Sequence, residues 1–104
     1  MDYEQTGGAR WNACSWFPVN VTWPFAKLYV NDELLSLSVN ALVVRRTFVF
    51  KRAEVVTIHR APSLFSSGVQ IEHTRRDCPT SIVFWTFNLD GLREQLVRRG
   101  YRWV

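Results

Sequence analysis

The sequence predicts a small, mainly β domain with an antiparallel barrel or sandwich of six to seven strands, capped by one C-terminal α-helix. Three observations support this fold class. Apolar and polar residues alternate with a period of two in the middle of the chain, turn residues separate the alternating runs, and only the last part shows helical spacing. The chain has 104 residues, 47% of them hydrophobic and 14% aromatic, which suffices for one domain with its own core.

Residues 1–23 are expected to form an N-terminal arm, and residues 24–104 the domain itself. Met1 to Arg10 is polar and holds two adjacent glycines, so it offers little to bury and is expected to be partly flexible. The aromatic stretch from Trp11 to Trp23 is interrupted by Pro18. We expect it to pack on the barrel, at best as a short edge strand.

The alternating runs predict six strands, and Asn31-Asp32-Glu33 is expected to be the turn of the first hairpin. The predicted strands are residues 25–30, 35–39, 47–51, 55–60, 69–74 and 81–87. The last of them is apolar on both faces, which indicates that another element packs on its second side. We expect the C-terminal helix to be that element.

Leucines at helical spacing predict a helix over about residues 89–99. Asn88 or Asp90 is suited to cap its start. Arg98-Arg99 followed by Gly100 is typical of a helix end, because cations oppose the helix dipole and glycine suits the stop. A helix of this length spans about 16 Å and is long enough to close one opening of a small barrel.

Several segments resemble the bacterial branch of the pleckstrin-homology-like (PH-like) fold. Phe48 to Ile58 is similar to its third strand, short break and "E-V/I-x-x-I" step into the fourth. Ser67 to Ile71 resembles its glycine-led fifth strand, and Val83 to Tyr101 its last strand and capping helix. The resemblance covers residues 24–101. It implies a binding scaffold, since members of this superfold bind lipid headgroups, peptides or proteins.

Members of that superfold that bind phosphoinositides carry lysine and arginine around the first hairpin. The loop expected there, Asn31-Asp32-Glu33, is acidic, and only Lys27 lies nearby. The resemblance therefore implies that the usual headgroup site is absent.

The sequence offers no pattern of an enzyme or a metal site: it has no glycine-rich phosphate loop, no Gly-x-Ser-x-Gly and no paired metal ligands. We expect no catalytic residue, metal or cofactor. Strand parity places His59 and His73 on opposite faces. The start lacks the basic and apolar runs of a secretory signal, so we expect a cytoplasmic protein. Cys14 and Cys78 are then expected to be reduced thiols, although one disulfide is arithmetically open.

Five tryptophans are more than one small barrel core holds comfortably. One hypothesis makes some of them a protein interface, where tryptophan is enriched; its candidate residues are Trp16, Trp23, Tyr29 and Trp103. The other hypothesis is a structural lid formed where the two chain ends pack together. The leading prediction is a non-catalytic interaction module that binds a protein or peptide partner or a second copy. One route is a peptide strand added to the edge beside the C-terminal helix.

The alternative function follows from the formal net charge of +4. It is a peripheral binder of anionic membrane lipid or another anionic ligand, which would use arginine clusters; the candidate residues are Arg45, Arg46, Arg75 and Arg76. The simpler hypothesis is that these side chains are solvated and partly neutralised by Glu54 and Asp77. Nucleic acid is not an expected partner, because most aromatic residues alternate inward and are not available for base stacking.

Overall fold

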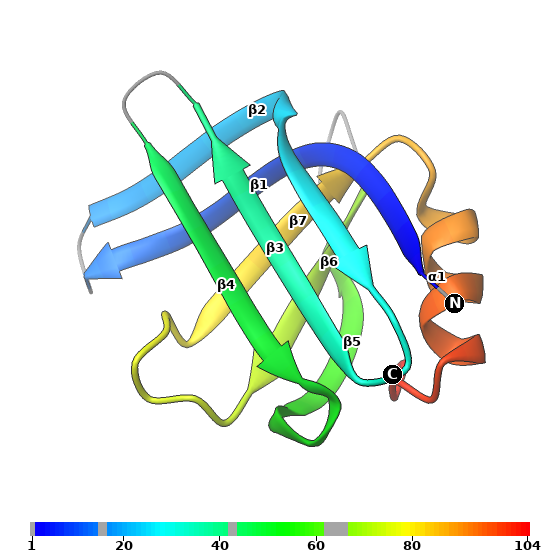
Figure 1. Cartoon of the computed structure of the whole chain (residues 1–104). Helices are drawn as coiled ribbons and strands as arrows, with labels where there is room; N and C mark the ends of the chain where they lie inside the picture. The colour runs from blue at the N-terminus through cyan, green and yellow to red at the C-terminus, as the bar shows by residue number, and fades with distance from the viewer. Residues whose placement is uncertain (1, 15–16, 42–43, 62–66) are drawn as a thin grey trace.

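The computed structural model describes residues 2–14, 17–41, 44–61 and 67–104, without the side chains of residues 13, 14 and 17. The elements follow in the order β1 (Tyr3–Cys14), β2 (Phe17–Val30), β3 (Leu34–Asn40), β4 (Arg45–Lys51), a 3-10 turn (Arg52–Glu54), β5 (Val55–Ala61), β6 (Ser67–His73), β7 (Ser81–Thr86) and α1 (Leu89–Arg98) (Figure 1).

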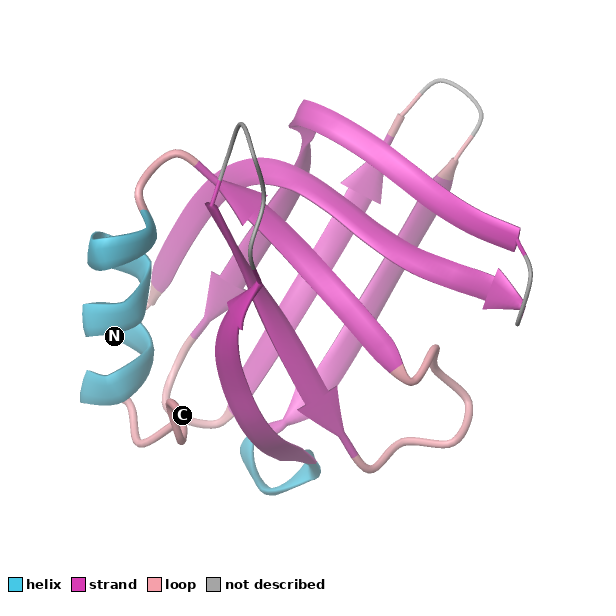
Figure 2. Ribbon diagram, turned by 180° about the vertical axis from the view of Figure 1, so that it is seen from behind, coloured by secondary structure: helices cyan, strands magenta, loops and turns pink. Residues whose placement is uncertain are grey.

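The described strands form one antiparallel seven-stranded sheet in the order β4-β3-β2-β1-β7-β6-β5. The sheet curls into an open barrel, and α1 lies at one end of it (Figure 2). The fold class predicted from the sequence is confirmed. The alternating runs were assigned correctly as β3 to β7 and the second half of β2, with ends that differ by a few residues.

The N-terminal part differs from its prediction. Residues 3–14 and 17–30 form the strands β1 and β2, and β1 lies in the middle of the sheet between β2 and β7. The expected loose terminus and arm are therefore wrong for the described residues. Glycine is required here for packing: a Cβ at Gly7 would lie 1.9 Å from the carbonyl oxygen of Trp85 on β7.

The second glycine of β1 lies at a bulge in the pairing of β1 with β2. β1 contributes only Gly8 at a place where β2 contributes Thr22–Phe25. A Cβ at Gly8 would lie 2.6 Å from the carbonyl oxygen of Val21. The extra residues of β2, which include the cis peptide bond between Trp23 and Pro24, therefore protrude from the sheet and expose their side chains.

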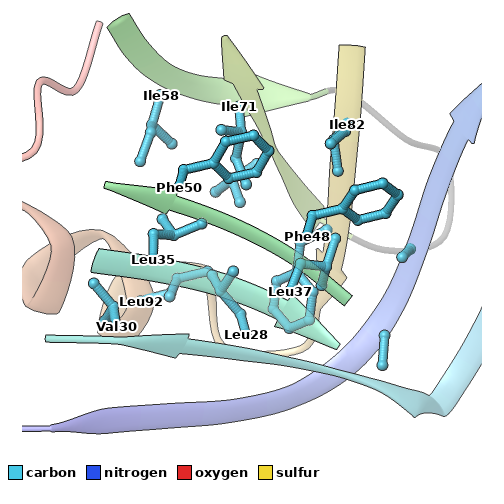
Figure 3. Packing of buried hydrophobic residues seen from close by; sticks show 14 of the residues in the cluster. Leu28, Val30, Leu35, Leu37, Phe48, Phe50, Ile58, Ile71, Ile82 and Leu92 are labelled. Carbon is cyan, nitrogen blue, oxygen red and sulfur yellow. The ribbon is translucent and has the colours of Figure 1, made fainter. Parts of the chain in front are cut away.

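The core fills the inside of the curled sheet. Alternate residues of the strands point into it, as the period of two predicts. Figure 3 shows these side chains converging from both halves of the sheet and from α1. The largest fully buried ones are Leu28, Val30, Leu35, Leu37, Phe48, Phe50, Ile58, Ile71, Ile82, Phe84, Leu92 and Leu96.

α1 begins and ends as its sequence predicts. The Asn88 side chain accepts a hydrogen bond from the backbone N–H of Gly91 (3.1 Å). Gly100 has a positive φ of 87° and donates to the Val97 carbonyl, while the next N–H, of Tyr101, donates to the Leu96 carbonyl. This pair of bonds is a Schellman motif, which satisfies carbonyls at the helix end.

The helix closes one end of the barrel and does not cover the outer face of β7, so that prediction is wrong. Its buried residues, Leu92 and Leu96, point into the same core as the strands. Figure 2 shows α1 beside the end of the sheet. The second apolar face of β7 must therefore have another explanation.

The side chain of Tyr101 is buried behind α1 and gives a pH-dependent prediction. Its hydroxyl has no hydrogen-bond partner among the described residues, and burial raises the pKa of Tyr101 from 10.0 to about 12. Below pH 10 the phenol is protonated in both the folded and the unfolded chain. Above pH 10 only the unfolded chain loses the proton, so the free energy of unfolding should fall by up to about 1.4 kcal/mol per pH unit.

The measurement is urea denaturation at a series of pH values between 9 and 12, roughly spanning the two pKa values, on the wild type and on Tyr101→Phe. The difference between the two proteins removes the contribution of other titrating groups. We expect the wild type to lose stability faster over this range. If the free energy of unfolding falls equally with pH in the two proteins, the pKa of Tyr101 is the same in the folded and the unfolded chain, which would contradict the prediction.

Candidate binding site on the outer face of the sheet

The outer face of β7 carries apolar side chains that no described helix covers. Ile82 and Phe84 point into the core, so Val83 and Trp85 point outward, and both are half-buried. The helix α1 does not lie over these two side chains. Contiguous exposed apolar patches often mark surfaces that bind another molecule, so this face is a candidate site.

Trp85 stands between two glycines of the neighbouring strands. It pairs with Gly8 on β1 and with Gly68 on β6. A Cβ at Gly68 would lie 2.6 Å from the indole Cε3, so the indole lies directly over that glycine. The indole therefore fills the space above Gly68, while the backbone of β2 lies over Gly8. Two hollows in the surface border Trp85.

The first hollow, called the aromatic hollow below, has a volume of about 240 Å³. Trp23 and Phe87 form part of its wall, with their rings 6.0 Å apart and inclined at 66°; this is the edge-to-face geometry that aromatic pairs favour. Trp23 is 54% exposed and Phe87 is 75% exposed. The described lining residues are Gly8, Asn20, Val21, Thr22, Trp23, Trp85, Thr86 and Phe87.

Hydrogen bonds on both sides of Phe87 fix its backbone. The Thr86 hydroxyl accepts from the backbone N–H of Asn88 (3.0 Å) and donates to the Gln5 side-chain carbonyl. The Gln5 amide also donates to the Asn88 carbonyl (3.2 Å). The start of β1 thus holds the turn between β7 and α1, and the Phe87 ring is presented to solvent from an anchored backbone.

The second hollow, called the polar hollow below, lies on the other side of Trp85 and has a volume of about 310 Å³. It contains several hydrogen-bonding side chains around Val83 and Trp85. Its described lining residues are Arg10, Trp11, Asn12, Ala61, Gln70, Ser81, Val83 and Trp85.

The strand register explains how these residues meet. Arg10, Val83 and Gln70 lie in one row across β1, β7 and β6. The side chains of Arg10, Asn12, Gln70 and Ser81 make no hydrogen bond or ion pair with another described residue. They are therefore available to a ligand.

A cross-strand cluster lies next to the polar hollow. The Thr57 hydroxyl donates to the Glu72 carboxylate (2.9 Å), and His59 Nε2 lies 3.4 Å from the other oxygen of the same carboxylate. Hydroxyl and imidazole both face the carboxylate and not each other, so the cluster does not activate a nucleophile. Within the described ranges no three His, Cys, Asp or Glu side chains form a group that could hold a metal.

The two histidines lie on opposite faces, as strand parity predicts. His73 packs on the ring of Phe50 (4.4 Å between centroids). Its Nδ1 accepts from the backbone N–H of Arg75 (3.1 Å), so Nε2 carries the proton and donates to the Pro79 carbonyl (2.6 Å). His73 thus stabilises the turn between β6 and β7.

The four candidate interface residues do not form one site. Trp16 lies outside the described residues. Trp23 is exposed in the aromatic hollow, as the interface hypothesis predicts. Tyr29 lies on β2, where its hydroxyl accepts from the Asn31 side chain (3.3 Å). Trp103 packs against the core near β5, with Arg93 over its ring (5.5 Å).

Trp11 is structural, but it is not part of a lid formed by the two chain ends. Trp11 is 3% exposed and packs edge-on against Phe48 (5.2 Å between centroids), so it is a core residue. Phe87 was missed by the sequence interpretation, which placed it at the end of the β7 run. The only indication in the sequence was the alternation along β7, which places the Phe87 side chain on the outer face together with Val83 and Trp85.

The edge of β5 beside α1 is occupied by the chain itself. The backbone N–H of Ile58 donates to the Arg102 carbonyl (2.8 Å), and the N–H of Val104 donates to the Ile58 carbonyl (3.0 Å). The residues after α1 thus take the place that an added peptide strand would need at Ile58. The expected route of strand addition beside the helix is blocked there.

The four candidate anion-binding arginines are only partly available. Arg75 donates to both carboxylate oxygens of Asp77 and to the Val49 carbonyl (2.6 Å), and this guanidinium holds the pKa of Asp77 below its usual value. Arg45 and Arg46 are exposed neighbours on β4, and alternation points them to opposite faces. Arg76 is exposed in the turn after β6.

The acidic turn Asn31-Asp32-Glu33 is not in the first hairpin. It connects β2 to β3, whereas β1 (Tyr3–Cys14) and β2 (Phe17–Val30) form the first antiparallel pair of the chain. The acidic charge of Asn31-Asp32-Glu33 therefore does not exclude a headgroup site at the first hairpin. The sequence from Asn12 to Pro18, which includes the adjoining ends of these two strands, carries no lysine or arginine.

Cys78 is a half-buried free thiol, and burial raises its pKa. The side chain of Cys14 lies outside the described residues. No helix in the described part of the chain is long and apolar enough to cross a membrane. Comparisons with protein-family models, with curated proteins and with solved structures each find no match.

Two substitutions separate the core tryptophan from the exposed aromatic pair. Trp11→Ala should lower the free energy of unfolding by about 3–5 kcal/mol, because it empties a buried site. Phe87→Ser should change it by less than about 0.5 kcal/mol, because the ring is mostly in solvent. Urea denaturation of both variants measures the two values. A loss at Phe87 as large as that at Trp11 would mean that Phe87 is a structural residue.

Proposed function

We propose that this chain is a non-catalytic interaction module that binds a protein or peptide partner at the aromatic hollow. The observation that carries the proposal is the exposure of two adjacent aromatic side chains, Trp23 and Phe87, on anchored backbone next to a hollow. Aromatic residues, above all tryptophan and tyrosine, supply much of the binding energy of protein interfaces. Concave sites with apolar walls and a few polar groups are typical ligand sites.

The rigidity of the site supports the same proposal. Phe87 is held by the bonds among Gln5, Thr86 and Asn88, and Trp23 lies in a bulge set by the packing of Gly8. Aromatic side chains that are already positioned lose little conformational entropy on binding. The resemblance to bacterial PH-like domains points to a binding scaffold as well.

We assign no catalytic residue and no cofactor to the chain. We place it in the cytoplasm, where a thiol such as Cys78 stays reduced. The partner is another protein or a second copy of this chain. The alternative, a binder of anionic lipid, has weaker support, because Arg75 is occupied by Asp77 and Val49 and because Arg45 and Arg46 diverge.

A photo-crosslinking phenylalanine analogue in place of Phe87 tests the proposal in cells that express the chain. Val97, which is 52% exposed on α1, provides the matched control position. We expect a crosslinked protein from position 87 and none from position 97. The product should disappear with Trp23→Ser, because Trp23 and Phe87 together form part of the wall of the hollow.

The mass of the crosslinked product identifies the partner. A product of twice the chain mass means self-association, and any other protein mass means a different partner. Equal crosslinking at both positions, or none at position 87, would refute the proposed site. Vesicle binding that is lost at high salt, without a crosslink at position 87, would favour the lipid alternative.

A further inference from the structure

We infer that the partner binds as an extended segment with an apolar side chain in the aromatic hollow and, two residues away, a carboxylate on Arg10. This inference rests on the proposed function and adds the chemistry of the partner. It comes from the polar hollow, which shares Trp85 with the aromatic hollow. The two hollows therefore lie next to each other along β7, on either side of Trp85, and are together called the groove below.

Among the described residues that line the two hollows, Arg10 is the only one with a charged side chain, and it lines the polar hollow. It is exposed and has no ion-pair partner among the described residues. The nearby carboxylate of Glu72 is engaged by Thr57 and His59 on the β5 side. A guanidinium that is free at the wall of a groove is suited to a carboxylate, which it can bind with two parallel hydrogen bonds.

The strand geometry sets the spacing. Gly8, under the aromatic hollow, and Arg10 are two residues apart on β1, which corresponds to about 7 Å. An extended ligand advances roughly 3.3–3.6 Å per residue, so two of its residues cover the same distance. Side chains of residues i and i+2 point to the same side of an extended chain. The expected recognition pattern is an apolar residue, any residue, and then aspartate or glutamate, in either chain direction.

Charge complementarity and hydrogen-bonding capacity support an acidic segment. Neither hollow is lined by a described acidic residue, and the whole chain has a formal net charge of +4. Asn12, Gln70 and Ser81 lie near Arg10 without hydrogen-bond partners among the described residues. They are able to bind the backbone amides of an extended ligand without preference for its sequence.

Selection from a phage-displayed library of random peptides tests this inference on the purified full chain. We expect enrichment of the apolar-x-acidic pattern. The same selection on Arg10→Glu should lose the acidic position and favour lysine or arginine there. With the best peptide, Arg10→Gln and the peptide's acid-to-amide change should each weaken binding about 10- to 100-fold, as measured by fluorescence anisotropy. The two changes together should cost little more than one alone.

Arg76→Glu is the matched control, because it makes the same change of charge at an exposed residue outside the groove. We expect it to weaken binding less than about threefold. An equal effect of Arg76→Glu and Arg10→Glu, or no acid at a fixed spacing, would overturn the inference and leave the proposed function intact. Failure to enrich any peptide, or peptides that bind Trp23→Ser and Phe87→Ser normally, would overturn the proposed function itself.

Discussion

The close packing of β1 against its two neighbours is the constraint on which the rest of the structure depends. β1 pairs with β2 on one side and with β7 on the other, and it thereby joins the two halves of the sheet. Side chains at Gly7 and Gly8 would collide with the carbonyl oxygens of Trp85 and Val21. Glycine at both positions allows the sheet to curl around one core.

The same constraint creates the candidate site. The bulge of β2 lies over Gly8, with the carbonyl oxygen of Val21 where a Cβ would be, and forms one wall of the aromatic hollow. The surplus residues of β2 protrude beside that hollow and expose Trp23. Gly68 has the corresponding role on β6, where it accommodates the indole of Trp85. The packing that lets the sheet curl and the groove on its outer face therefore have a common cause.

The sequence predicted the regular part of the fold because local signals there agree with the tertiary structure. Alternation along Leu35–Val39 and the cap and stop of α1 are local, and both have their expected roles. The N-terminal strands were not predicted, since glycine and proline are ordinarily strand breakers. Only a contact distant in the sequence, between Gly7 and Trp85, shows that glycine is required there.

The candidate site was predicted only in part, for the same reason. Trp23 was a candidate because the chain has more tryptophans than one small barrel core holds comfortably. The apolar outer face of β7 was noticed but was assigned to helix packing, because periodicity does not show which element covers a face. Arg10 and Phe87 carried no motif. Arg10 lies at the site because β1 pairs with β7. Phe87 lies there because Gln5 forms a hydrogen bond with the turn before α1.

Gly8 links the packing of the sheet to the proposed binding groove, so nuclear magnetic resonance spectra of Gly8→Ala test this link most directly. We expect the amide signals of β3, β4, β5 and β6 to be retained. The signals of Val21 and the indole N–H signals of Trp23 and Trp85 should shift, and addition of a peptide that binds the wild type should cause no further change. A variant with wild-type indole signals and wild-type peptide binding would contradict the account.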